Sequence, residues 1–303
     1  MLKRMLIFVL VALFIAACGP AQEQAQGPQY GIEPAHVSKR IYRFAIHPLY
    51  NPNKLTELYQ PLFDYMNRQV EGSHFELEAS RDYAAYEAKF RSRQVEFLLP
   101  NPWQTLEAMK SGYNVIAIAG DSASFKGIFL VRTDSDIKTP RDVKGKVVSY
   151  PSPTALAATV MAQYYLHKNG INVNRDIDNR YVGSQESSIM HVYLKQSDIG
   201  ATWPSPWHAF QREHAQEAAQ MKVIWETPSL VNNSVMVRND VPPQIRDQVR
   251  KILVDMHNSE EGRAILQKME TARFYPATDS DYAPVREYIQ RFEREVRPVE
   301  MKK

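Results

Sequence analysis

The chain has 303 residues, with 37 Lys and Arg against 34 Asp and Glu, and 44% of its residues are hydrophobic. This length suits two domains of ordinary size or one large one, and the mixture of apolar and charged residues is typical of a globular protein and excludes a disordered one. The nearly neutral charge gives no support for a nucleic-acid partner, because nucleic-acid-binding domains concentrate positive charge.

The first 17 residues form a separate segment. They begin with the cations Lys3 and Arg4 and continue as an apolar run that ends in small residues. This run is too short to span a bilayer comfortably, so we expect residues 1–17 to be an export signal. Their removal leaves 35 cations against 34 anions, a net charge near +1.

Cys18, the only cysteine, follows this segment directly. The order Ile15-Ala16-Ala17-Cys18-Gly19 resembles the lipobox of bacterial lipoproteins, in which the signal is cut before a cysteine that is then lipidated. The alternative is a plain signal peptide with a coincidental cysteine. Acyl chains contribute roughly 0.8 kcal/mol per buried CH₂, so multiple acylation would hold a soluble domain on a membrane. Residues 18–40, rich in Gln, Pro and Gly, are expected to form a flexible tether.

From Ile41 onward, short apolar strands alternate with amphipathic helices. The first half predicts strands at 42–46, 75–79, 95–99 and 115–119, with helices at 54–70, 83–94 and 101–112 between them. This order is the signature of a mostly parallel sheet with helices on its faces.

A second α/β set lies between two similar strands, 127–133 and 235–237. It predicts strands at 147–150, 180–182, 199–202 and 222–225, and helices at 154–168, 186–196 and from the Trp-Pro-Ser-Pro-Trp segment to about 219. Helices at 243–257, 259–269 and 282–296 complete the chain. We therefore expect an α/β fold of two lobes, the second inserted into the first. Residues 41–131 and 235–303 would form lobe 1 and residues 132–234 lobe 2, with hinge crossovers near 132–136 and 227–234.

The stretch Ser149–Thr159, SYPSPTALAAT, is the strongest candidate for a binding site. It reads as a strand end, a tight turn and a helix start, in which Ser152 is the N-cap, Pro153 takes the first helical position and Thr154 lies in the first turn. The first N–H groups of a helix lack internal partners and carry partial positive charge, so this turn could cradle an anion without any lysine or arginine. The alternative is an ordinary capped helix.

Other strand-to-helix turns follow the same plan. Asn51-Pro52 and Asn101-Pro102 each pair a capping residue with proline, and Gly183–Ser188 (GSQESS) offers hydroxyls, a carboxamide and another helix start. A capping box at Ser184 is the alternative there, and it is compatible with ligand binding. Ligands of open parallel sheets bind at the carboxyl ends of the strands, which is where these turns lie.

Aromatic residues gather near the same turns: Tyr50, Tyr83, Trp103, Trp203 and Trp207. Any one of them can be a core residue, but a cleft walled by rings with a few polar groups is the usual small-molecule site. His47, at a strand end, is either a ligand contact or a solvated or capping histidine.

Enzyme motifs are missing from the sequence. It contains no G-x-S-x-G, H-E-x-x-H, G-x-G-x-x-G or P-loop pattern, and no histidine pair has metal-ligand spacing on an obvious helix face. A single cysteine excludes a thiolate metal site. We therefore expect no catalytic residues, no metal and no cofactor.

Together, the lipobox, the tether, the two lobes and the turns SPTALAAT and VGSQESS resemble bacterial periplasmic substrate-binding lipoproteins of ABC transporters, in the phosphate/phosphite/phosphonate-binding branch. The resemblance covers most of residues 41–295. In that family a Ser/Thr-rich turn holds the phosphonate oxygens, which implies roles for Ser152, Thr154 and Ala155. Pro153 and Ala155 interrupt the family's frequent Ser-Thr-Ser-Gly order.

The resemblance extends to a second turn, the family's Gly-Ser-His-(Asp/Glu), which corresponds to Gly183–Glu186 with glutamine replacing histidine. Ligand-touching tyrosines of the family map near Tyr50 and onto Trp103. Members that bind aminoalkylphosphonates hold the amine with acids, whereas Ser205 and Asn232-Asn233 stand at those approximate positions. An amine-bearing ligand is therefore not expected.

The turns and the resemblance give thirteen candidate ligand-binding residues: His47, Tyr50, Asn101, Trp103, Ser152, Thr154, Ala155, Ser184, Gln185, Glu186, Trp203, Ser205 and Asn232. The implied function is a membrane-tethered, monomeric binding protein, facing the periplasm or cell exterior, that closes on a small oxyanion and delivers it to an ABC permease. Two alternatives stay open. One is a ligand sensor for a membrane kinase or regulator, and the other is the same fold with a sulfonate or pyrimidine ligand.

Overall fold

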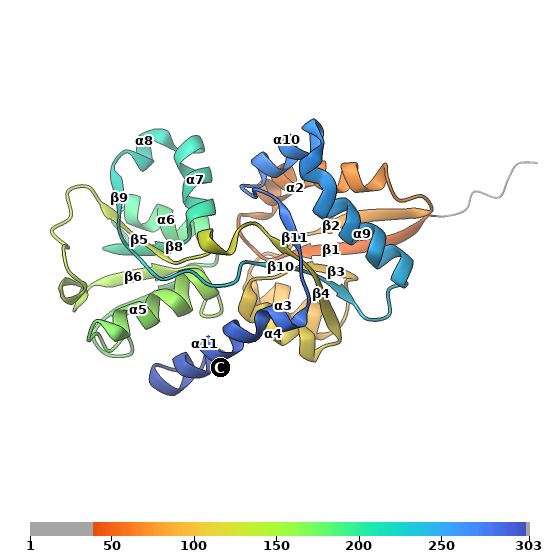
Figure 1. Cartoon of the computed structure of the whole chain (residues 1–303). Helices are drawn as coiled ribbons and strands as arrows, with labels where there is room; N and C mark the ends of the chain where they lie inside the picture. The colour runs from red at the N-terminus through yellow and green to blue at the C-terminus, as the bar shows by residue number, and fades with distance from the viewer. Residues whose placement is uncertain (1–38, 301–303) are drawn as a thin grey trace, which may run out of the picture. The chain divides into compact units, whose positions relative to one another are not determined.

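The computed structural model describes residues 39–300. The expected signal peptide, Cys18 and most of the expected tether lie outside these residues. Two β-sheets organise the described chain, and each is covered by helices (Figure 1). We call the first sheet and its helices lobe 1, and the second sheet and its helices lobe 2.

Lobe 1 contains a six-stranded sheet in the order β11-β4-β10-β3-β1-β2. Its strands are β1 (Arg40–Ile46), β2 (Ser73–Glu78), β3 (Phe97–Leu99), β4 (Tyr113–Ala119), β10 (Ser234–Arg238) and β11 (Phe274–Pro276). β2 and β3 pair with β1 in parallel, as expected, whereas β10 runs antiparallel between β3 and β4, and β11 runs antiparallel to β4. The sheet is therefore mixed at one side.

The helices of lobe 1 follow from its sequence patterns. They are α2 (Pro52–Asn67), α3 (Tyr83–Arg91), α4 (Pro102–Lys110), α9 (Pro243–Asp255), α10 (Glu260–Lys268) and α11 (Ala283–Glu295). α2 begins as expected, because the Asn51 side chain accepts a hydrogen bond from the Lys54 N–H and Pro52 opens the helix. Its Leu55 and Leu62 are fully buried, and burial of such side chains contributes about 1.5–3 kcal/mol each.

Lobe 2 contains a five-stranded sheet in the order β7-β6-β8-β5-β9. Its strands are β5 (Ile128–Arg132), β6 (Val147–Tyr150), β7 (Asp178–Tyr181), β8 (Ile199–Thr202) and β9 (Met221–Glu226). Its helices are a π-helix at Leu156–Met161 that continues as α5 (Ala162–Lys168), then α6 (Gln185–Tyr193), α7 (Pro204–Glu213) and α8 (Ala215–Ala218). β6 pairs in parallel with β7 and β8, and β5 runs antiparallel to β8 and β9.

The first crossover lies earlier than the sequence suggested. β5 belongs to the second sheet, because Phe129 pairs with both Ala201 and Trp225. The chain therefore passes between the sheets at 120–127, and the expected crossover near 132–136 and lobe boundary at 131 are wrong. An apolar strand such as IFLV fits either sheet, and only its long-range pairing decides between them. The return passage, at 227–233, lies within the expected 227–234.

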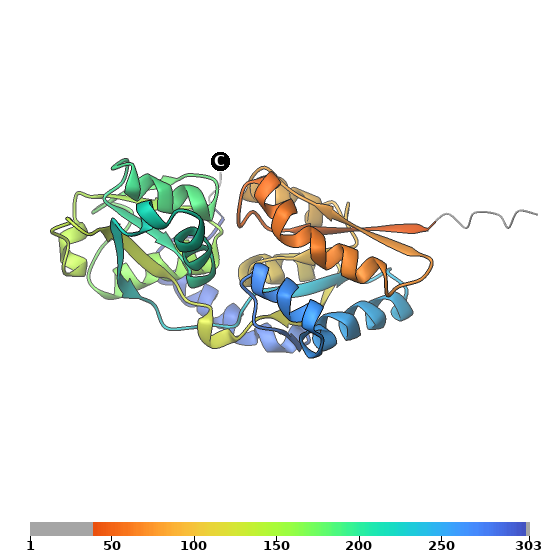
Figure 2. The ribbon, with the colours of Figure 1, turned by 90° about the horizontal axis from the view of Figure 1, so that it is seen from above.

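Two further features connect the lobes. The crossovers are joined by hydrogen bonds from the Thr227 N–H to the Gly127 carbonyl, 2.9 Å, and from the Leu230 N–H to the Phe125 carbonyl, 2.9 Å. The C-terminal helix α11 packs on α4 of lobe 1, and its Glu295 accepts hydrogen bonds from Tyr164 and Lys168 of lobe 2. Figures 1 and 2 show α11 extending from one lobe to the other. Within residues 39–300, no helix has the length and apolar character needed to cross a bilayer.

Candidate binding site

A small cavity lies where strand ends of both lobes face each other. We call it the inner cavity, and its lining residues are His47, Tyr83, Asn101, Phe125, Ala155, Leu156, Ala157, Gln185, Trp203 and Asn233. Its volume is about 10 Å³, which is roughly the space for the centre of one water-sized sphere. Several of these residues begin helices directly after strands, as expected for a ligand site in this class of sheet.

The start of the π-helix provides the unpaired donors of this cavity. Ala155 precedes the helix and offers no side-chain cap. Its carbonyl accepts from both the Thr159 and Val160 N–H groups, at 2.9 and 3.2 Å, whereas the N–H groups of Leu156 and Ala157 make no hydrogen bond within residues 39–300. Free donors at the positive end of a helix favour a bound anion.

The expectation that Ser152 is the N-cap of the helix is wrong. The helix begins at Leu156, three residues later than a Ser152 cap requires. The Ser152 hydroxyl lies 3.0 Å from the Thr154 hydroxyl and accepts from the Thr154 N–H at 3.3 Å. Such local bonds compete with helix formation, so the turn closes on itself and leaves the helix uncapped.

The side chains of Ser152 and Thr154 do not line the inner cavity. The Thr154 hydroxyl donates to the carboxylate of Glu87 across the lobes, at 2.6 Å, and Gln104 donates to the same oxygen at 3.1 Å. Burial raises the pKa of Glu87. Both hydroxyls are thus engaged within the protein, and the turn contributes backbone N–H groups to the cavity instead.

His47 is held as a neutral acceptor. Its Nδ1 lies 2.8 Å from the Leu99 carbonyl oxygen, and because a carbonyl only accepts, Nδ1 carries the proton and Nε2 keeps a lone pair. Burial lowers the pKa of His47 to about 4. The imidazole is therefore uncharged near neutral pH and presents an acceptor at Nε2.

Tyr83 and Gln185 form a second contact between the lobes. The Thr202 hydroxyl donates to Gln185 Oε1 at 2.8 Å, which orients the carboxamide so that its Nε2 donates to the Tyr83 hydroxyl at 3.1 Å. Burial raises the pKa of Tyr83, so this phenol keeps its proton. Its O–H is then a further donor available beside the cavity.

Asn101 lines another side of the inner cavity. Its Oδ1 accepts from the N–H groups of Trp103 and Gln104, at 3.0 and 3.1 Å, and Gln104 returns a bond to the Asn101 N–H, so the expected cap is a complete capping box. The Asn101 Nδ2 donates to the Thr154 carbonyl at 3.1 Å. This bond joins helix α4 of lobe 1 directly to the turn in lobe 2.

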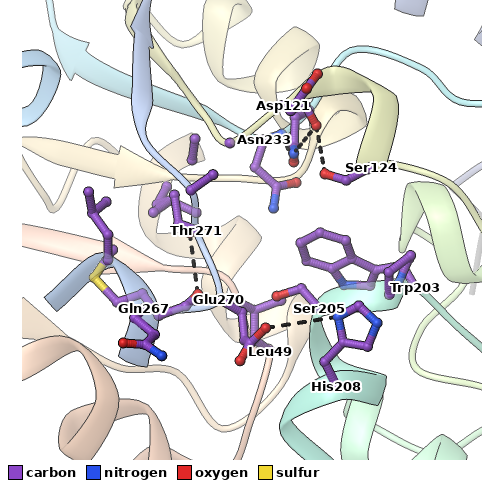
Figure 3. Close-up of a pocket in the computed structure, with 18 of the residues that line it drawn as sticks. Leu49, Asp121, Ser124, Trp203, Ser205, His208, Asn233, Gln267, Glu270 and Thr271 are labelled. Atoms are coloured by element: carbon purple, nitrogen blue, oxygen red, sulfur yellow. Dashed lines mark hydrogen bonds and ion pairs between the residues drawn. The ribbon is translucent and has the colours of Figure 1, made fainter. Parts of the chain in front are cut away.

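A larger cavity of about 700 Å³ adjoins the inner one, and we call it the outer cavity (Figure 3). Trp203 and Asn233 line both. At the outer cavity Arg212 of lobe 2 forms an ion pair with Glu270 of lobe 1. A further ion pair between the lobes joins Lys54 to Glu213 at 2.7 Å. These contacts bring the lobes together around both cavities.

The structure gathers some of the predicted site residues and separates others. His47, Asn101, Ala155, Gln185 and Trp203 line the inner cavity. Ser205 and Asn232 line the outer cavity only. The remaining candidates line neither: Tyr50, Trp103, Ser152, Thr154, Ser184 and Glu186.

Each of these remaining side chains has other partners. Tyr50 and Trp103 are buried in the hydrophobic core of lobe 1. Ser184 caps α6 by accepting from the Ser187 N–H at 3.1 Å. Glu186 lies 3.8 Å from His214. These residues support the turns and the core around the cavity.

Five cavity residues were not among the candidates: Tyr83, Phe125, Leu156, Ala157 and Asn233. Tyr83 was named among the aromatic residues near the turns but was not chosen as a ligand contact, although Asp82 caps α3 four residues after the end of β2. Asn233 adjoins a predicted residue in the return crossover. Phe125 lies in the first crossover, whose misplacement hid it. Within residues 39–300, no group of three His, Cys, Asp or Glu side chains has a metal-binding arrangement.

Comparisons with known proteins agree with this architecture. A family model described as the periplasmic substrate-binding protein of phosphonate ABC transporters matches residues 44–282. The phosphonates-binding periplasmic protein of Escherichia coli K12 is 21% identical over 267 residues, which cover 84% of this chain and 78% of that protein.

Two solved structures are similar in fold. The binding-protein component of an ABC phosphonate transporter from Pseudomonas aeruginosa superposes with a TM-score of 0.77 at 18% identity, covering 85% of this chain and 88% of that one. PhnD1 from Prochlorococcus marinus, in complex with methylphosphonate, gives a TM-score of 0.78 at 15% identity, covering 84% and 99%. The expected two-lobed fold is thereby confirmed.

Proposed function

Because this chain belongs to the family of periplasmic substrate-binding proteins of phosphonate ABC transporters, we propose that it captures a phosphonate-type oxyanion in the inner cavity and delivers it to an ABC permease. Family membership implies export to the periplasm and a binding role. The carrying observation is the uncapped helix start, whose Leu156 and Ala157 N–H groups are free beside the polar side chains of both lobes.

Recognition would rest on neutral donors. The helix N–H groups and the Tyr83 hydroxyl can donate to oxyanion oxygens, and hydrogen bonds to a charged group contribute about 1.5–3 kcal/mol each. The inner cavity is smaller than an oxyanion, so binding requires the lobes to separate and close again around the ligand. A ligand that bridges both lobes stabilises the closed arrangement, which is the form a permease would receive.

The neutral imidazole of His47 favours a phosphorus oxyanion over a sulfonate. Its Nε2 lone pair needs a proton opposite it, and a phosphate-type group keeps one below its second pKa, about 6 for phosphate esters. A sulfonate has no proton at neutral pH, so its oxygen would face the Nε2 lone pair unless His47 itself took up a proton. The site therefore suits a singly protonated phosphonate, phosphite or phosphate better than a sulfonate.

Isothermal titration calorimetry with methylphosphonate, phosphite, phosphate and methanesulfonate tests this proposal. We expect a phosphorus oxyanion to bind at least tenfold more tightly than methanesulfonate, and at about 100 times Kd it should add about 2.7 kcal/mol to the free energy of unfolding. No binding of any phosphorus oxyanion would contradict the proposal.

The variant His47→Asn tests the role of the histidine in this selectivity. The asparagine Nδ2–H can replace the Nδ1–H donor to Leu99. Its Oδ1 then takes the place of the imidazole Cδ2, so no acceptor stands at the position of Nε2. We expect the preference for methylphosphonate over methanesulfonate to shrink about tenfold, corresponding to about 1.4 kcal/mol. An unchanged preference would remove His47 from the selection of the ligand.

The remaining parts of the proposal concern partners and anchoring. We propose that Cys18 carries the lipid anchor, so that Cys18→Ala moves the protein from the membrane fraction to the soluble fraction. We also propose that the chain acts as a monomer, which light scattering can measure. Cross-linking in membranes should capture a permease, and capture of a kinase without a permease would favour the sensor alternative.

A further inference from the structure

The outer cavity has the properties of a site for the organic part of a ligand. It adjoins the inner cavity through Trp203 and Asn233, which line both. Its volume of about 700 Å³ falls in the range of small-molecule sites, whereas the inner cavity has room only near the oxyanion donors. A ligand held by its oxyanion in the inner cavity would therefore project its substituent into the outer one.

Asn233 provides an unsatisfied polar group between the two cavities. The residue is 3% exposed, and its Oδ1 is buried without a hydrogen-bond partner in residues 39–300. Its backbone is engaged, since its carbonyl accepts from the Ala119 N–H at 2.8 Å and its N–H donates to Asn232 Oδ1 at 2.7 Å. Figure 3 shows the Asn233 carboxamide pointing into the outer cavity.

The neighbouring asparagine shows the contrast. Asn232 also lines the outer cavity, but its Nδ2 donates to the Asp121 carbonyl at 3.0 Å and its Oδ1 accepts from the Asn233 N–H. Leaving a buried polar atom unpaired costs about 1–3 kcal/mol. A hydrogen-bond donor on a ligand would recover this energy at Asn233 and not at Asn232.

The charged groups of the outer cavity balance one another. Glu270 pairs with Arg212, and Arg263 donates to the backbone carbonyls of His257 and Asn258 at 3.1 and 3.2 Å. Asp121 accepts from the Ala123 N–H at 3.0 Å. Two carboxylates and two guanidinium groups thus line the cavity, and no excess charge selects an ionised substituent. The remaining wall includes the apolar faces of Trp203 and Leu266.

We propose that the outer cavity binds the substituent of an organophosphonate or phosphate monoester, and that this substituent is bulky, uncharged and rich in hydrogen-bonding groups, about the size of a sugar. This inference rests on the proposed function, because the oxyanion must occupy the inner cavity. It assigns Asn233 as the residue that recognises a donor on the substituent. Under this proposal, the natural ligand differs from inorganic phosphate, phosphite and methylphosphonate. Those three are too small to make contacts in the outer cavity.

The test compares methylphosphonate, glucose 1-phosphate and 2-aminoethylphosphonate by calorimetry on the full chain. We expect glucose 1-phosphate to bind at least tenfold more tightly than methylphosphonate. We expect 2-aminoethylphosphonate, whose substituent carries an ammonium group, to gain less than threefold over methylphosphonate. Tighter binding of methylphosphonate than of glucose 1-phosphate would overturn the inference and leave the proposed function intact. Binding of none of the three would overturn both.

A cavity-filling variant locates the substituent. Thr271 lines the outer cavity and not the inner one (Figure 3), so Thr271→Trp should weaken glucose 1-phosphate at least tenfold and leave methylphosphonate within twofold. Glu287→Trp, on the exposed face of α11, controls for adding a tryptophan and should change neither ligand. Equal affinity of glucose 1-phosphate for Thr271→Trp and the unmodified chain would overturn the assignment.

Discussion

Two strand-to-helix turns that look alike in sequence have opposite outcomes in the structure. Asn101-Pro102 and Ser152-Pro153 each pair a capping residue with proline. Asn101 consumes the first donors of α4 in a capping box, whereas Ser152 bonds within its own turn and leaves the N–H groups of Leu156 and Ala157 free. A closed helix end supports the fold, and an open one is available to a ligand. The missing cap is therefore the feature on which the proposed binding site rests.

The largest expected effect comes from closing the open helix end. Ala155→Asp places a carboxylate at the N-cap position, where it would accept from the free N–H groups and repel an anion. Losing two charge-assisted bonds costs at least about 3 kcal/mol, so calorimetry should record a loss of methylphosphonate affinity above 100-fold. Ala155→Ser, a neutral cap, should lose less. Retained affinity in the aspartate variant would place the anion elsewhere.

The second effect concerns the histidine beside that helix end. Burial lowers the pKa of His47 to about 4 from its usual 6.5, so the unfolded chain binds more protons between these values. Stability should therefore rise with pH from about 4 to 6.5, by about 3 kcal/mol from this group. Urea unfolding across this range should show a smaller rise in His47→Asn, and equal slopes in both proteins would contradict the buried neutral imidazole.

Opening the closed helix end should have a moderate effect. Asn101→Ala removes the cap of α4 and the bond to the Thr154 carbonyl, which together should lower the free energy of unfolding by about 2 kcal/mol. Asn101→Asp keeps the cap and loses only the Nδ2 donor, so it should recover about half of the loss. If both variants unfold alike in urea, the cap does not stabilise α4.

The smallest effect on binding is expected at the turn itself. Ser152→Ala removes a hydroxyl that bonds only within the turn, so we expect a stability loss of about 1 kcal/mol and a change in methylphosphonate affinity below tenfold. Thr154→Val should destabilise more, because the buried Glu87 carboxylate loses a partner. A 100-fold loss of affinity in Ser152→Ala would instead show that the hydroxyl of this turn contacts the ligand.

The sequence predicted the alternation of strands and helices well, because most elements carry clear apolar periodicity. It missed β11, whose three residues, Phe274–Pro276, are too few to show a period. It also assigned β5 to the wrong sheet, since the pairing of Phe129 with Trp225 joins residues far apart in the chain. Local patterns specify elements, and only long-range contacts specify their neighbours.

The site was predicted where it depends on the end of a strand and missed where it depends on side-chain orientation. His47, Asn101 and Gln185 each lie within four residues of the end of a strand, so the topology brings them together. The hydroxyl of Thr154 turns away because it donates a hydrogen bond to Glu87, 67 residues earlier in the chain. The resemblance to the family indicated a turn that borders the inner cavity, but the hydroxyls that it aligned have other partners in this chain.

The C-terminal segment gives the lobes a third mechanical link. Arg297 donates to Gln163 at 2.8 Å and to the Pro153 carbonyl at 3.2 Å, and α11 packs on α4. A pair of crossovers alone permits both bending and twisting, whereas an additional brace on one edge resists the twist. We therefore expect the lobes to open by a hinge motion about the crossovers, with little twist. The separation between Arg212 and Glu270 should then increase most. Because Arg297 binds the Pro153 carbonyl, the same link would bring the turn at 152–155 back to the same position each time the lobes close.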